Sequence, residues 1–261
     1  MSRLDSELVA RGLARSRERA KEMIRSGSVT VNGKTARKPS DEVSETDEIF
    51  SGETEQFVGR GAFKLEKAVN EFCIDLAGKV CLDIGASTGG FTDYMLQNGA
   101  AKVYAVDVGH GQLAEALVND PRVVNMEGTD IREVTAGDIG GRADFISVDV
   151  SFISLEKILP KVFELLEDGA CAAVLIKPQF EAGRSNIGKR GIVKDRKVHI
   201  QVLSEIDSFA RSIGFVTEKY TYSPVRGGSG NIEYLVKLRK SQGVSEIHDF
   251  KELTDSSFSK L

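Results

Sequence analysis

The sequence lacks the features that mark membrane-spanning, disulfide-bonded and metal-binding proteins. Its longest apolar stretches, such as residues 171–176, are much shorter than the roughly 20 residues that cross a bilayer. The opening MSRLDSEL has no apolar segment of the kind found in secretory signals. The three cysteines are widely spaced, and the three histidines form no metal-ligand cluster with them. We therefore expect a cytoplasmic globular protein that has no metal and no membrane segment.

The 261 residues, 41% of them apolar, suffice for one large domain and a small one, and their charges are unevenly distributed. Residues 1–39 contain ten Lys or Arg and four Asp or Glu, whereas residues 40–56 contain seven acidic residues and no basic one. Residues 57–261 contain 25 basic and 28 acidic residues. A small basic module thus precedes an acidic connector and a mildly acidic domain. On charge alone, the basic module either binds a polyanion or only presents a solvated surface.

The basic module predicts two short helices followed by a hairpin. Asp5 is expected to cap the first helix, and Ser16 the second, over residues 17–25. Gly27 is expected to end the second helix in the left-handed conformation. The alternation of residues 29–31 predicts a strand that leads into an Asn-Gly turn. The second helix carries four bases: Arg17, Arg19, Lys21 and Arg25.

The stretch SRERAKEMIRSGSVTVNGK, residues 16–34, resembles the S4 domain, a small RNA-binding module, and the likeness extends over roughly residues 1–60. The family implies contact with folded RNA through shape and phosphates rather than through base sequence. The resemblance therefore implies RNA contacts by Arg17, Arg19, Lys21 and Arg25.

From residue 79 onward, short β-rich runs alternate with helical segments. Expected strands cover residues 79–84, 102–107, 122–126, 144–150, 170–177, 215–222 and 232–238. Expected helices lie near residues 90–98, 111–118, 154–167 and 195–212. This alternation predicts an α/β fold with a mainly parallel, seven-stranded sheet that is covered on both faces. Ligands of such sheets bind beyond the carboxyl ends of the strands.

A glycine-rich loop follows the first expected strand. Its G-x-x-x-G-G spacing, which begins at Gly85, differs from the G-x-G-x-x-G of dinucleotide-binding proteins. Asp83 would repel a pyrophosphate but attract a ligand with an ammonium and a sulfonium group. Asp107, at the end of the second strand, is placed to accept hydrogen bonds from both hydroxyls of a ribose. Asp130, after the third strand, is placed to accept a hydrogen bond from the amino group of an adenine. The alternative is a cluster of turn glycines without a ligand.

This set of strand-end residues resembles the S-adenosylmethionine-dependent methyltransferases with a Rossmann-like sheet. The resemblance implies S-adenosylmethionine as the cofactor. It implies a cofactor site made by Asp83, Gly85, Ser87, Thr88, Gly89, Gly90, Phe91, Asp107, Asp130 and Asp149. The three cysteines lie in apolar strands or at a helix end, and we expect them to belong to the core.

Four ionisable residues stand at the ends of expected elements. Lys64 precedes the first strand, Asp149 ends the fourth, Lys177 follows the apolar run of the fifth, and Glu233 lies in the last. A lysine at the end of a buried strand is costly to desolvate unless it is paired or functional, and Asp149, one strand away, is its natural partner. A purely structural ion pair is the alternative to a catalytic role.

Lys64, Asp149, Lys177 and Glu233, in this order, resemble the catalytic tetrad of the FtsJ-like ribose 2′-O-methyltransferases. With the S4-like module in front, the chain resembles the TlyA (hemolysin A) family along nearly its whole length. Further matching stretches are residues 102–113, 149–155, 176–184 and 230–236. The resemblance implies ribosomal RNA or ribosomal subunits as partners, and it indicates no oligomeric state.

Three segments follow from this resemblance. Residues 1–60 form an S4-like RNA-binding domain with its acidic connector, and residues 61–240 form an FtsJ-like methyltransferase domain. Residues 241–261 form a tail that is either a docked short helix or a frayed end.

The chemistry of the tetrad can be argued from pKa values. A ribose 2′-hydroxyl is a poor nucleophile at neutral pH, so a positioned base must take its proton during attack. Lysine, with an ordinary pKa of about 10.4, serves only when burial, a second lysine and the cofactor's sulfonium favour the neutral amine. The two carboxylates oppose that change, so we expect them to orient their partners. This predicts Lys177 as the base, oriented by Asp149, with Lys64 and Glu233 fixing the hydroxyl.

Three other functions are considered. Methylation at C5 of a base needs a cysteine nucleophile near the cofactor, and N-methylation of bases usually shows an Asn/Asp-Pro-Pro-aromatic loop, which residues 149–152, DVSF, do not match. The family name hemolysin suggests a membrane-lytic activity, but the sequence shows no amphipathic or membrane-spanning segment of the required length. An RNA-binding protein with an inactive methyltransferase domain is disfavoured by the complete tetrad.

Overall fold

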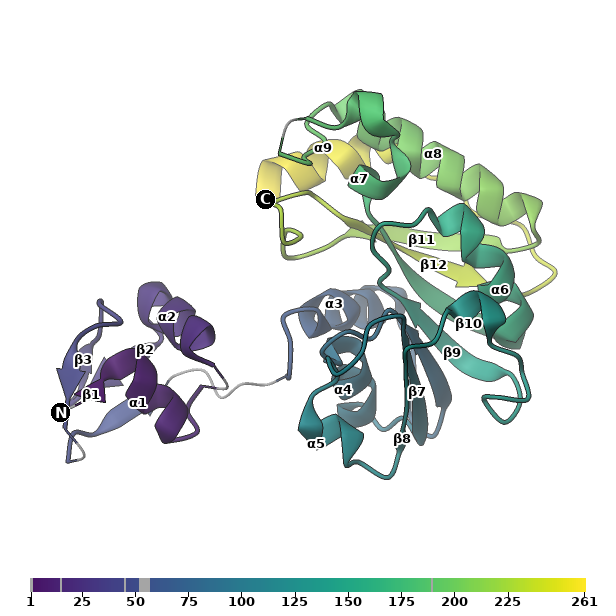
Figure 1. Ribbon diagram of the computed structural model, residues 1–261. Helices are drawn as coiled ribbons and strands as arrows, with labels where there is room; N and C mark the ends of the chain where they lie inside the picture. The colour runs from purple at the N-terminus through teal and green to yellow at the C-terminus, as the bar shows by residue number, and fades with distance from the viewer. Residues whose placement is uncertain (1, 15, 45, 52–56, 189) are drawn as a thin grey trace. The chain divides into compact units, whose positions relative to one another are not determined.

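The computed structural model describes residues 2–14, 16–44, 46–51, 57–188 and 190–261 (Figure 1). The chain forms two compact units, residues 1–56 and residues 57–261. The first contains short strands and two helices, and the second is built around one large sheet. Of the helices within the described ranges, none is both long and apolar enough to cross a membrane.

The first unit packs two helices against short strands. Helices α1 and α2 cover Leu4–Ala10 and Arg17–Ser26, and the strands are β1 (Ser2–Arg3), β2 (Val29–Val31), β3 (Lys34–Thr35), β4 (Glu42–Val43) and β5 (Ile49–Ser51). β1 pairs with β4, and β2 lies between β3 and β5, all antiparallel. The small core of this unit includes the buried Leu4, Leu8, Ala20, Met23, Ile24 and Val29.

The ends of helix α2 follow from its sequence. Oγ of Ser16 accepts a hydrogen bond from the backbone N–H of Arg19 at 3.2 Å, which satisfies one of the free N–H groups of the first turn. Gly27 ends the helix in the left-handed conformation, with φ of 82°. Asn32 and Gly33 have φ of 50° and 74°, as a two-residue hairpin turn of this type requires. The predicted caps and turn of this segment are confirmed.

The predicted cap at Asp5 is wrong. Helix α1 begins at Leu4, two residues earlier than a cap at Asp5 requires, and the residue before it, Arg3, makes no capping hydrogen bond with its side chain. The backbone N–H groups of Leu4 and Asp5 donate instead to the carbonyls of Asp41 and Pro39. Because the neighbouring chain satisfies these N–H groups, no side-chain cap is needed. The carboxylate of Asp5 is directed to two arginine side chains.

A seven-stranded sheet forms the centre of the second unit (Figure 1). Its strands are β6 (Val80–Ile84), β7 (Lys102–Asp107), β8 (Val123–Glu127), β9 (Ala143–Val148), β10 (Leu166–Ile176), β11 (Val216–Tyr222) and β12 (Tyr234–Arg239). Their order is β11-β12-β10-β9-β6-β7-β8, and β12 is antiparallel to both of its neighbours while the other pairs are parallel. The predicted α/β fold with a mainly parallel seven-stranded sheet is confirmed.

Apolar side chains cover both faces of this sheet, as buried parallel strands require. Successive residues of β6 enter opposite layers. Cys81 belongs to the layer with helices α3 (Ala62–Phe72) and α4 (Gly90–Gln97). Leu82 belongs to the layer with α6 (Leu159–Leu165) and α8 (Arg196–Ser212). The short helices α5 (Glu115–Val118) and α7 (Pro178–Glu181) lie between strands.

Helices α3 and α9, like the short α7, lie outside the ranges in which the sequence analysis placed helices. Helix α3 precedes the first strand of the sheet and carries Lys64 in its first turn. The tail contains helix α9 (Phe250–Lys260), which packs against α8 and β11. The ring of Phe258 lies 5.0 Å from that of His199, and Arg196 forms an ion pair with Asp255 at 2.7 Å. The tail is therefore a docked helix, one of the two forms considered for it.

Candidate active site

A cavity of about 470 Å³ lies at the carboxyl ends of β6, β7 and β9, where ligands of such sheets bind. Five of the predicted cofactor residues line it: Gly85, Ser87, Asp107, Asp130 and Asp149. The other five, Asp83, Thr88, Gly89, Gly90 and Phe91, do not. Residues that the sequence analysis missed include Gly109, Gln112, Thr129, Arg132, Ser151 and Phe152. Four of these six lie in residues 102–113 and 149–155, two of the stretches that resemble the TlyA (hemolysin A) family. That resemblance is the signal from which they could have been predicted.

Gly85 brings two strand ends together in this cavity. Its φ is 85°, and a Cβ atom there would lie 2.4 Å from the carbonyl oxygen of Asp149. The backbone N–H of Asp149 donates to the carbonyl of Ile84 at 2.9 Å. A side chain at position 85 would therefore push the segment that carries Asp149 away from β6.

Backbone donors fix the carboxylate of Asp107. Its Oδ2 accepts from the N–H of Ser87 at 2.8 Å, and its Oδ1 accepts from the N–H of Gly109 at 2.7 Å. Each carboxylate oxygen can accept a second hydrogen bond. Asp107 can therefore receive two hydroxyl groups of a ligand, as predicted for a ribose.

Asp130 shares its carboxylate with a neighbour that the sequence analysis did not consider. Nη2 of Arg132 lies 2.5 Å from Oδ2 of Asp130, and Nε lies 3.0 Å from Oδ1. These hydrogen bonds lower the pKa of Asp130. Arg132 also lines the cavity, so the predicted contact of Asp130 with an adenine would be made beside a guanidinium.

Gly89, Gly90 and Phe91, which do not line the cavity, serve the packing of helices. Gly89 has φ of 94°, and a Cβ atom there would lie 2.2 Å from a leucine side chain of α5. A Cβ atom at Gly90 would lie 3.1 Å from the backbone nitrogen of Ala62, and Phe91 is buried in the layer with α3. Gly90 thus lets α3 approach α4 closely, which sets the position of Lys64 two residues further along α3.

Asp83 is fully buried and does not reach the cavity. Oγ1 of Thr92 donates to its Oδ2 at 2.7 Å, and Oγ of Ser147 donates to its Oδ1 at 2.9 Å. Burial raises the pKa of Asp83 to about 6, although both hydroxyl donors lower it. The carboxylate is therefore held by two hydroxyl groups inside the protein rather than presented to a ligand.

We expect Asp83→Asn to remove a pH dependence of stability. The pKa of Asp83 in the folded chain, about 6, lies above its ordinary value of 3.8, so lowering the pH through this interval stabilises the fold. Asparagine does not titrate, so at neutral pH the variant should equal or exceed the wild type in free energy of unfolding, by up to about 3 kcal/mol. This advantage should shrink toward pH 4 in urea unfolding at a series of pH values.

Asp120→Asn is the matched control for this experiment. Hydrogen bonds from Arg122 lower the pKa of Asp120, so its substitution should give a pH slope of the opposite sign. A difference between Asp83→Asn and wild type that is constant from pH 4 to pH 7 would contradict the raised pKa.

Lys177, Asp149, Lys64 and Glu233 form a continuous chain of ion pairs beside the cavity. Nζ of Lys177 lies 2.5 Å from Oδ1 of Asp149. Nζ of Lys64 lies 3.5 Å from Oδ2 of Asp149 and 2.7 Å from Oε2 of Glu233. Lys177 and Glu233 are buried, and the side chains of the other two are at most 19% exposed. Asp149, which lines the cavity, thus connects it to both lysines.

Four elements bring these side chains together. Lys177 follows β10 and Asp149 follows β9, and these strands are parallel neighbours. Lys64 lies in the first turn of α3, and Glu233 immediately precedes β12. A Cβ atom at Gly227 would lie 2.2 Å from Oε1 of Glu233, so the loop before β12 passes close to this carboxylate. The ion pair predicted between Lys177 and Asp149 is present.

The surroundings of Lys64 favour its charged form. Burial by itself lowers the pKa of an amine, but the carboxylates of Asp149 and Glu233 outweigh burial and raise the pKa of Lys64.

Two polar neighbours of the four residues were not expected from the sequence. Nζ of Lys177 donates to Oγ of Ser151 at 3.0 Å, and Nε2 of Gln179 donates to Oε1 of Glu233 at 3.4 Å.

Known proteins share this arrangement of domains. The FtsJ-like methyltransferase family matches residues 57–240, and the S4 domain matches residues 2–49. A Bacillus subtilis protein named provisionally as an rRNA methyltransferase (YqxC) is 48% identical over 90% of this chain and 85% of its own length. The 16S/23S rRNA (cytidine-2′-O)-methyltransferase TlyA of Mycobacterium tuberculosis is 45% identical over 91% of this chain and 90% of its own. The chain belongs to the FtsJ-like methyltransferase family.

A solved structure extends the likeness of this FtsJ-like methyltransferase to both units. A Streptococcus thermophilus protein named provisionally as a hemolysin matches with a TM-score of 0.79 and 42% identity, over 99% of this chain and 96% of its own. The S4 domain before an FtsJ-like domain, together with these relatives, confirms the predicted resemblance to the TlyA (hemolysin A) family.

FtsJ-like methyltransferases use S-adenosylmethionine as methyl donor, and the cavity of this member fits that cofactor. The missing side chain at Gly85 lets the segment that carries Asp149 lie against β6, and both residues line the cavity. The fixed carboxylate of Asp107 offers acceptors to two hydroxyls, and Asp149 places negative charge where a sulfonium would be stabilised.

Asp107→Ala should weaken cofactor binding before it affects any later step. The substitution removes acceptors for two hydroxyls and leaves the N–H groups of Ser87 and Gly109 without their partner. The Kd for S-adenosylmethionine should therefore rise roughly ten- to hundred-fold in a calorimetric titration. Asp120→Ala, which removes a carboxylate paired with Arg122 outside the cavity, is the control. An unchanged Kd would show that Asp107 is not the ribose contact.

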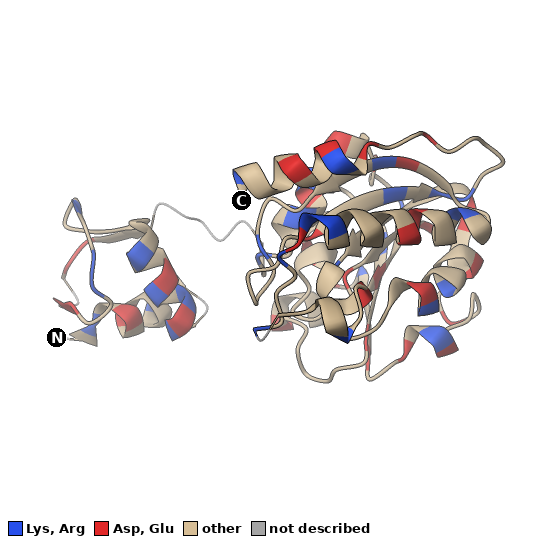
Figure 2. Cartoon of the chain, turned by 90° about the horizontal axis from the view of Figure 1, so that it is seen from above, with Lys and Arg blue, Asp and Glu red and all other residues tan. Residues whose placement is uncertain are grey.

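The four predicted RNA contacts of the S4 domain lie on α2. Three of them are paired: Arg17 with Asp5 at 3.3 Å, Arg19 with Glu22 at 3.3 Å and Lys21 with Glu18 at 2.5 Å. Arg25 is exposed. Basic and acidic residues are accordingly interspersed on this unit (Figure 2). Glu18 and Glu22 are themselves exposed, so their pairs are weak surface pairs in which a phosphate could replace the carboxylate.

Proposed function

We propose that this protein methylates the ribose 2′-hydroxyl of a nucleotide in ribosomal RNA, a cytidine as in the relative from Mycobacterium tuberculosis. The observation that carries the proposal is the position of Asp149, which lines the cofactor cavity and is ion-paired with Lys177 and Lys64. A hydroxyl that reaches the two lysines is therefore next to the cofactor cavity, and such proximity supplies much of the rate of a group transfer.

The cofactor would be held by the cavity residues Gly85, Ser87, Asp107, Asp130 and Asp149. When bound, S-adenosylmethionine supplies an electrophilic methyl group on a sulfonium centre. Asp107 would accept the hydroxyls of its ribose, and Asp130 its adenine amino group.

Lys177 is assigned the role of general base. Its Nζ forms an ion pair with Oδ1 of Asp149 and donates a hydrogen bond to Oγ of Ser151. The neutral amine would take the proton of the 2′-hydroxyl as that oxygen bonds to the methyl group and the methyl–sulfur bond breaks, so that S-adenosylhomocysteine leaves and Lys177 is left protonated. The ion pair with Asp149 orients the amine of Lys177.

Lys64 and Glu233 are assigned to the position of the attacking hydroxyl. The raised pKa of Lys64 keeps its amine protonated, so Lys64 acts as a donor and not as a base. A donor aimed at the 2′-oxygen stabilises the negative charge that develops as the proton leaves. Glu233, which Gln179 contacts on its other oxygen, fixes the amine of Lys64 in place.

The cysteines give no support to methylation at C5 of a base. Cys81 and Cys171 are buried, and burial raises the pKa of Cys81 to about 12. Cys73 is exposed at the end of α3, and none of the three lines the cavity. A low-pKa thiol beside the cofactor, which that chemistry requires, is therefore missing from the described residues.

The test is to map 2′-O-methylated nucleotides in ribosomal RNA from cells with the protein, without it, and with the Lys177→Ala variant. We expect a methylated nucleotide that disappears in both altered strains. Purified protein with S-adenosylmethionine should restore it on unmodified ribosomal subunits. Loss of a base methylation instead, or an unchanged set of modified nucleotides, would contradict the proposal.

A further inference from the structure

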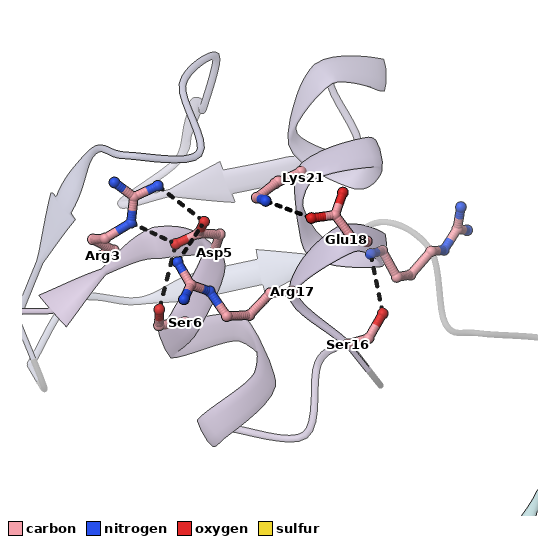
Figure 3. A network of polar contacts seen from close by, with 8 residues as sticks. Arg3, Asp5, Ser6, Ser16, Arg17, Glu18 and Lys21 are labelled. Carbon is pink, nitrogen blue, oxygen red and sulfur yellow. Dashed lines mark hydrogen bonds and ion pairs between the residues drawn. The ribbon is translucent and has the colours of Figure 1, made fainter.

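Asp5 is a fully buried carboxylate at the start of the S4 domain, and two arginines from different elements meet on it (Figure 3). Nε and Nη2 of Arg3, on β1, donate to Oδ1 and Oδ2 at 3.0 Å each. Nη2 of Arg17, the first residue of α2, donates to Oδ2 at 3.3 Å. Oγ of Ser6 donates to Oδ1 at 3.4 Å. These four donors occupy the four acceptor positions of the carboxylate.

The two arginines remain half exposed although their partner is buried. Their side chains are 49% and 56% exposed, for Arg3 and Arg17 respectively. The hydrogen bonds from Arg3, with the contribution of Arg17, lower the pKa of Asp5 to about 2, so the carboxylate stays charged near neutral pH. The cluster therefore combines one buried negative charge with two positive charges that reach solvent.

Two further ion pairs on α2, among the residues that the structure describes, have the opposite arrangement. Glu18 is 81% exposed and its partner Lys21 only 27%, and Glu22 is 51% exposed and its partner Arg19 only 22%. In those pairs the acid faces solvent, so an incoming phosphate must displace it. At Asp5 the carboxylate is buried and the two arginine side chains face solvent. The arginines can therefore stay paired with Asp5 while they contact a phosphate.

We propose that Asp5 is a positioning residue that holds Arg3 and Arg17 as a paired phosphate-binding site for structured RNA. The inference rests on the proposed function, because it concerns how the S4 domain contacts the RNA substrate. A guanidinium has five N–H donors in a planar fork, and Asp5 takes two from Arg3 and one from Arg17. The remaining N–H groups of each guanidinium donate to phosphate oxygens of the bound RNA.

The gain from this arrangement is pre-organisation. An unrestrained arginine loses rotamer freedom when it binds a phosphate, and this loss weakens binding. Asp5 has already ordered both guanidiniums in the free protein, so less freedom is lost when RNA binds.

Net charge and positioning predict opposite effects of removing this carboxylate. Asp5→Asn makes the domain more positive, which alone strengthens RNA binding. Loss of positioning weakens binding instead, because the amide has one acceptor oxygen and no charge with which to hold the two guanidiniums. The direction of the change in Kd therefore separates the two explanations.

The experiment measures the Kd of the full chain for ribosomal RNA across a salt series, for wild type, Asp5→Asn and Glu18→Gln. Glu18→Gln is the matched control, because it neutralises one acid of the same domain in a pair whose acid is exposed. We expect Asp5→Asn to raise Kd about tenfold and to reduce the salt slope by about one phosphate contact. Glu18→Gln should leave Kd unchanged or lower it. A folded Asp5→Asn variant that binds RNA as tightly as wild type, or more tightly, would overturn the proposal.

A second variant decides the matter if Asp5→Asn unfolds the S4 domain in thermal melting. Arg3→Lys combined with Arg17→Lys keeps both charges but replaces both planar forks by point charges. A clear rise in Kd for this double variant supports the paired site, and a wild-type Kd overturns it. If wild type itself fails to bind ribosomal RNA, the proposed substrate falls and the paired site with it. Tight binding by both wild type and Asp5→Asn rejects only the role of Asp5.

Discussion

Lys177→Ala is expected to reduce methyl transfer by roughly two to four orders of magnitude, the usual contribution of a positioned general base. The Kd for S-adenosylmethionine should stay within a few-fold of wild type. Nζ of Lys177 contacts Asp149 and Ser151, but Lys177 does not line the cofactor cavity. The truncation therefore removes the proton acceptor without removing a cofactor contact. Single-turnover transfer to unmodified ribosomal subunits and a calorimetric titration measure the two quantities.

Lys237 offers a matched control, because it is a buried lysine of the same sheet outside the site. It is 8% exposed, as Lys177 is, and its Nζ lies 2.9 Å from Glu218 and 3.1 Å from the carbonyl of Phe72. Lys237→Ala should lower Tm, since it removes one of the two basic partners of Glu218, the other being Arg239, and leaves the carbonyl of Phe72 without its donor. The transfer rate of the folded protein should stay at the wild-type value. If both variants lower Tm and neither lowers the rate, the pair of Lys177 with Asp149 is structural.

The sheet could be predicted because its strands are short apolar runs separated by turn-forming residues. Helix α3 carries an equally readable signal. Leu65, Ala68, Val69 and Phe72 are buried at helical spacing, and a sequence scan could have found them. The tail is different. Ile247, Phe250 and Leu253 share a helical spacing, but the helix begins only at Phe250 and Ile247 is fully exposed.

Asp83 shows why strand-end carboxylates were only partly predictable. Side chains alternate along β6, so Asp83 lies on the same face as Cys81, the face that α4 covers. It therefore meets Thr92 of α4 rather than the cavity. Asp107 is the last residue of β7, and Asp149 follows β9. At these positions the chain leaves the sheet, so the alternation of side chains between the two faces no longer decides where the carboxylate points.

The pairing within the tetrad could not be worked out from spacing. Lys64 and Glu233 are 169 residues apart, and their contact depends on how α3 packs beside the sheet. Gly90 allows α3 to lie close, because a Cβ atom there would be 3.1 Å from the backbone nitrogen of Ala62, and Gly227 leaves space beside Oε1 of Glu233. The resemblance to a family motif named the four residues, but the ion-pair distances come only from the fold.

Lys21→Glu combined with Arg25→Glu is expected to separate RNA capture from methyl transfer. Residues 1–39 would then contain eight basic and six acidic residues instead of ten and four. Phosphate contacts supply most of the capture energy, so the Kd for ribosomal RNA should rise about ten- to hundred-fold and depend less on salt. The cavity and the tetrad lie in the other unit, so cofactor affinity and turnover at saturating RNA should stay near wild type.

The control for this prediction reverses two charges on α9 of the methyltransferase domain, Lys251→Glu with Lys260→Glu, and so makes the same change in total charge. Lys251 is 78% exposed, so its reversal disturbs no core contact. If RNA capture depended on the net charge of the whole protein, both pairs of substitutions would raise Kd equally. Because residues 57–261 already carry more acidic than basic residues, we expect the α9 pair to change Kd only a few-fold. Equal losses would show that RNA capture depends on the net charge of the whole protein and not on α2 in particular, and an unchanged Kd in the α2 pair would remove Lys21 and Arg25 from the RNA contacts.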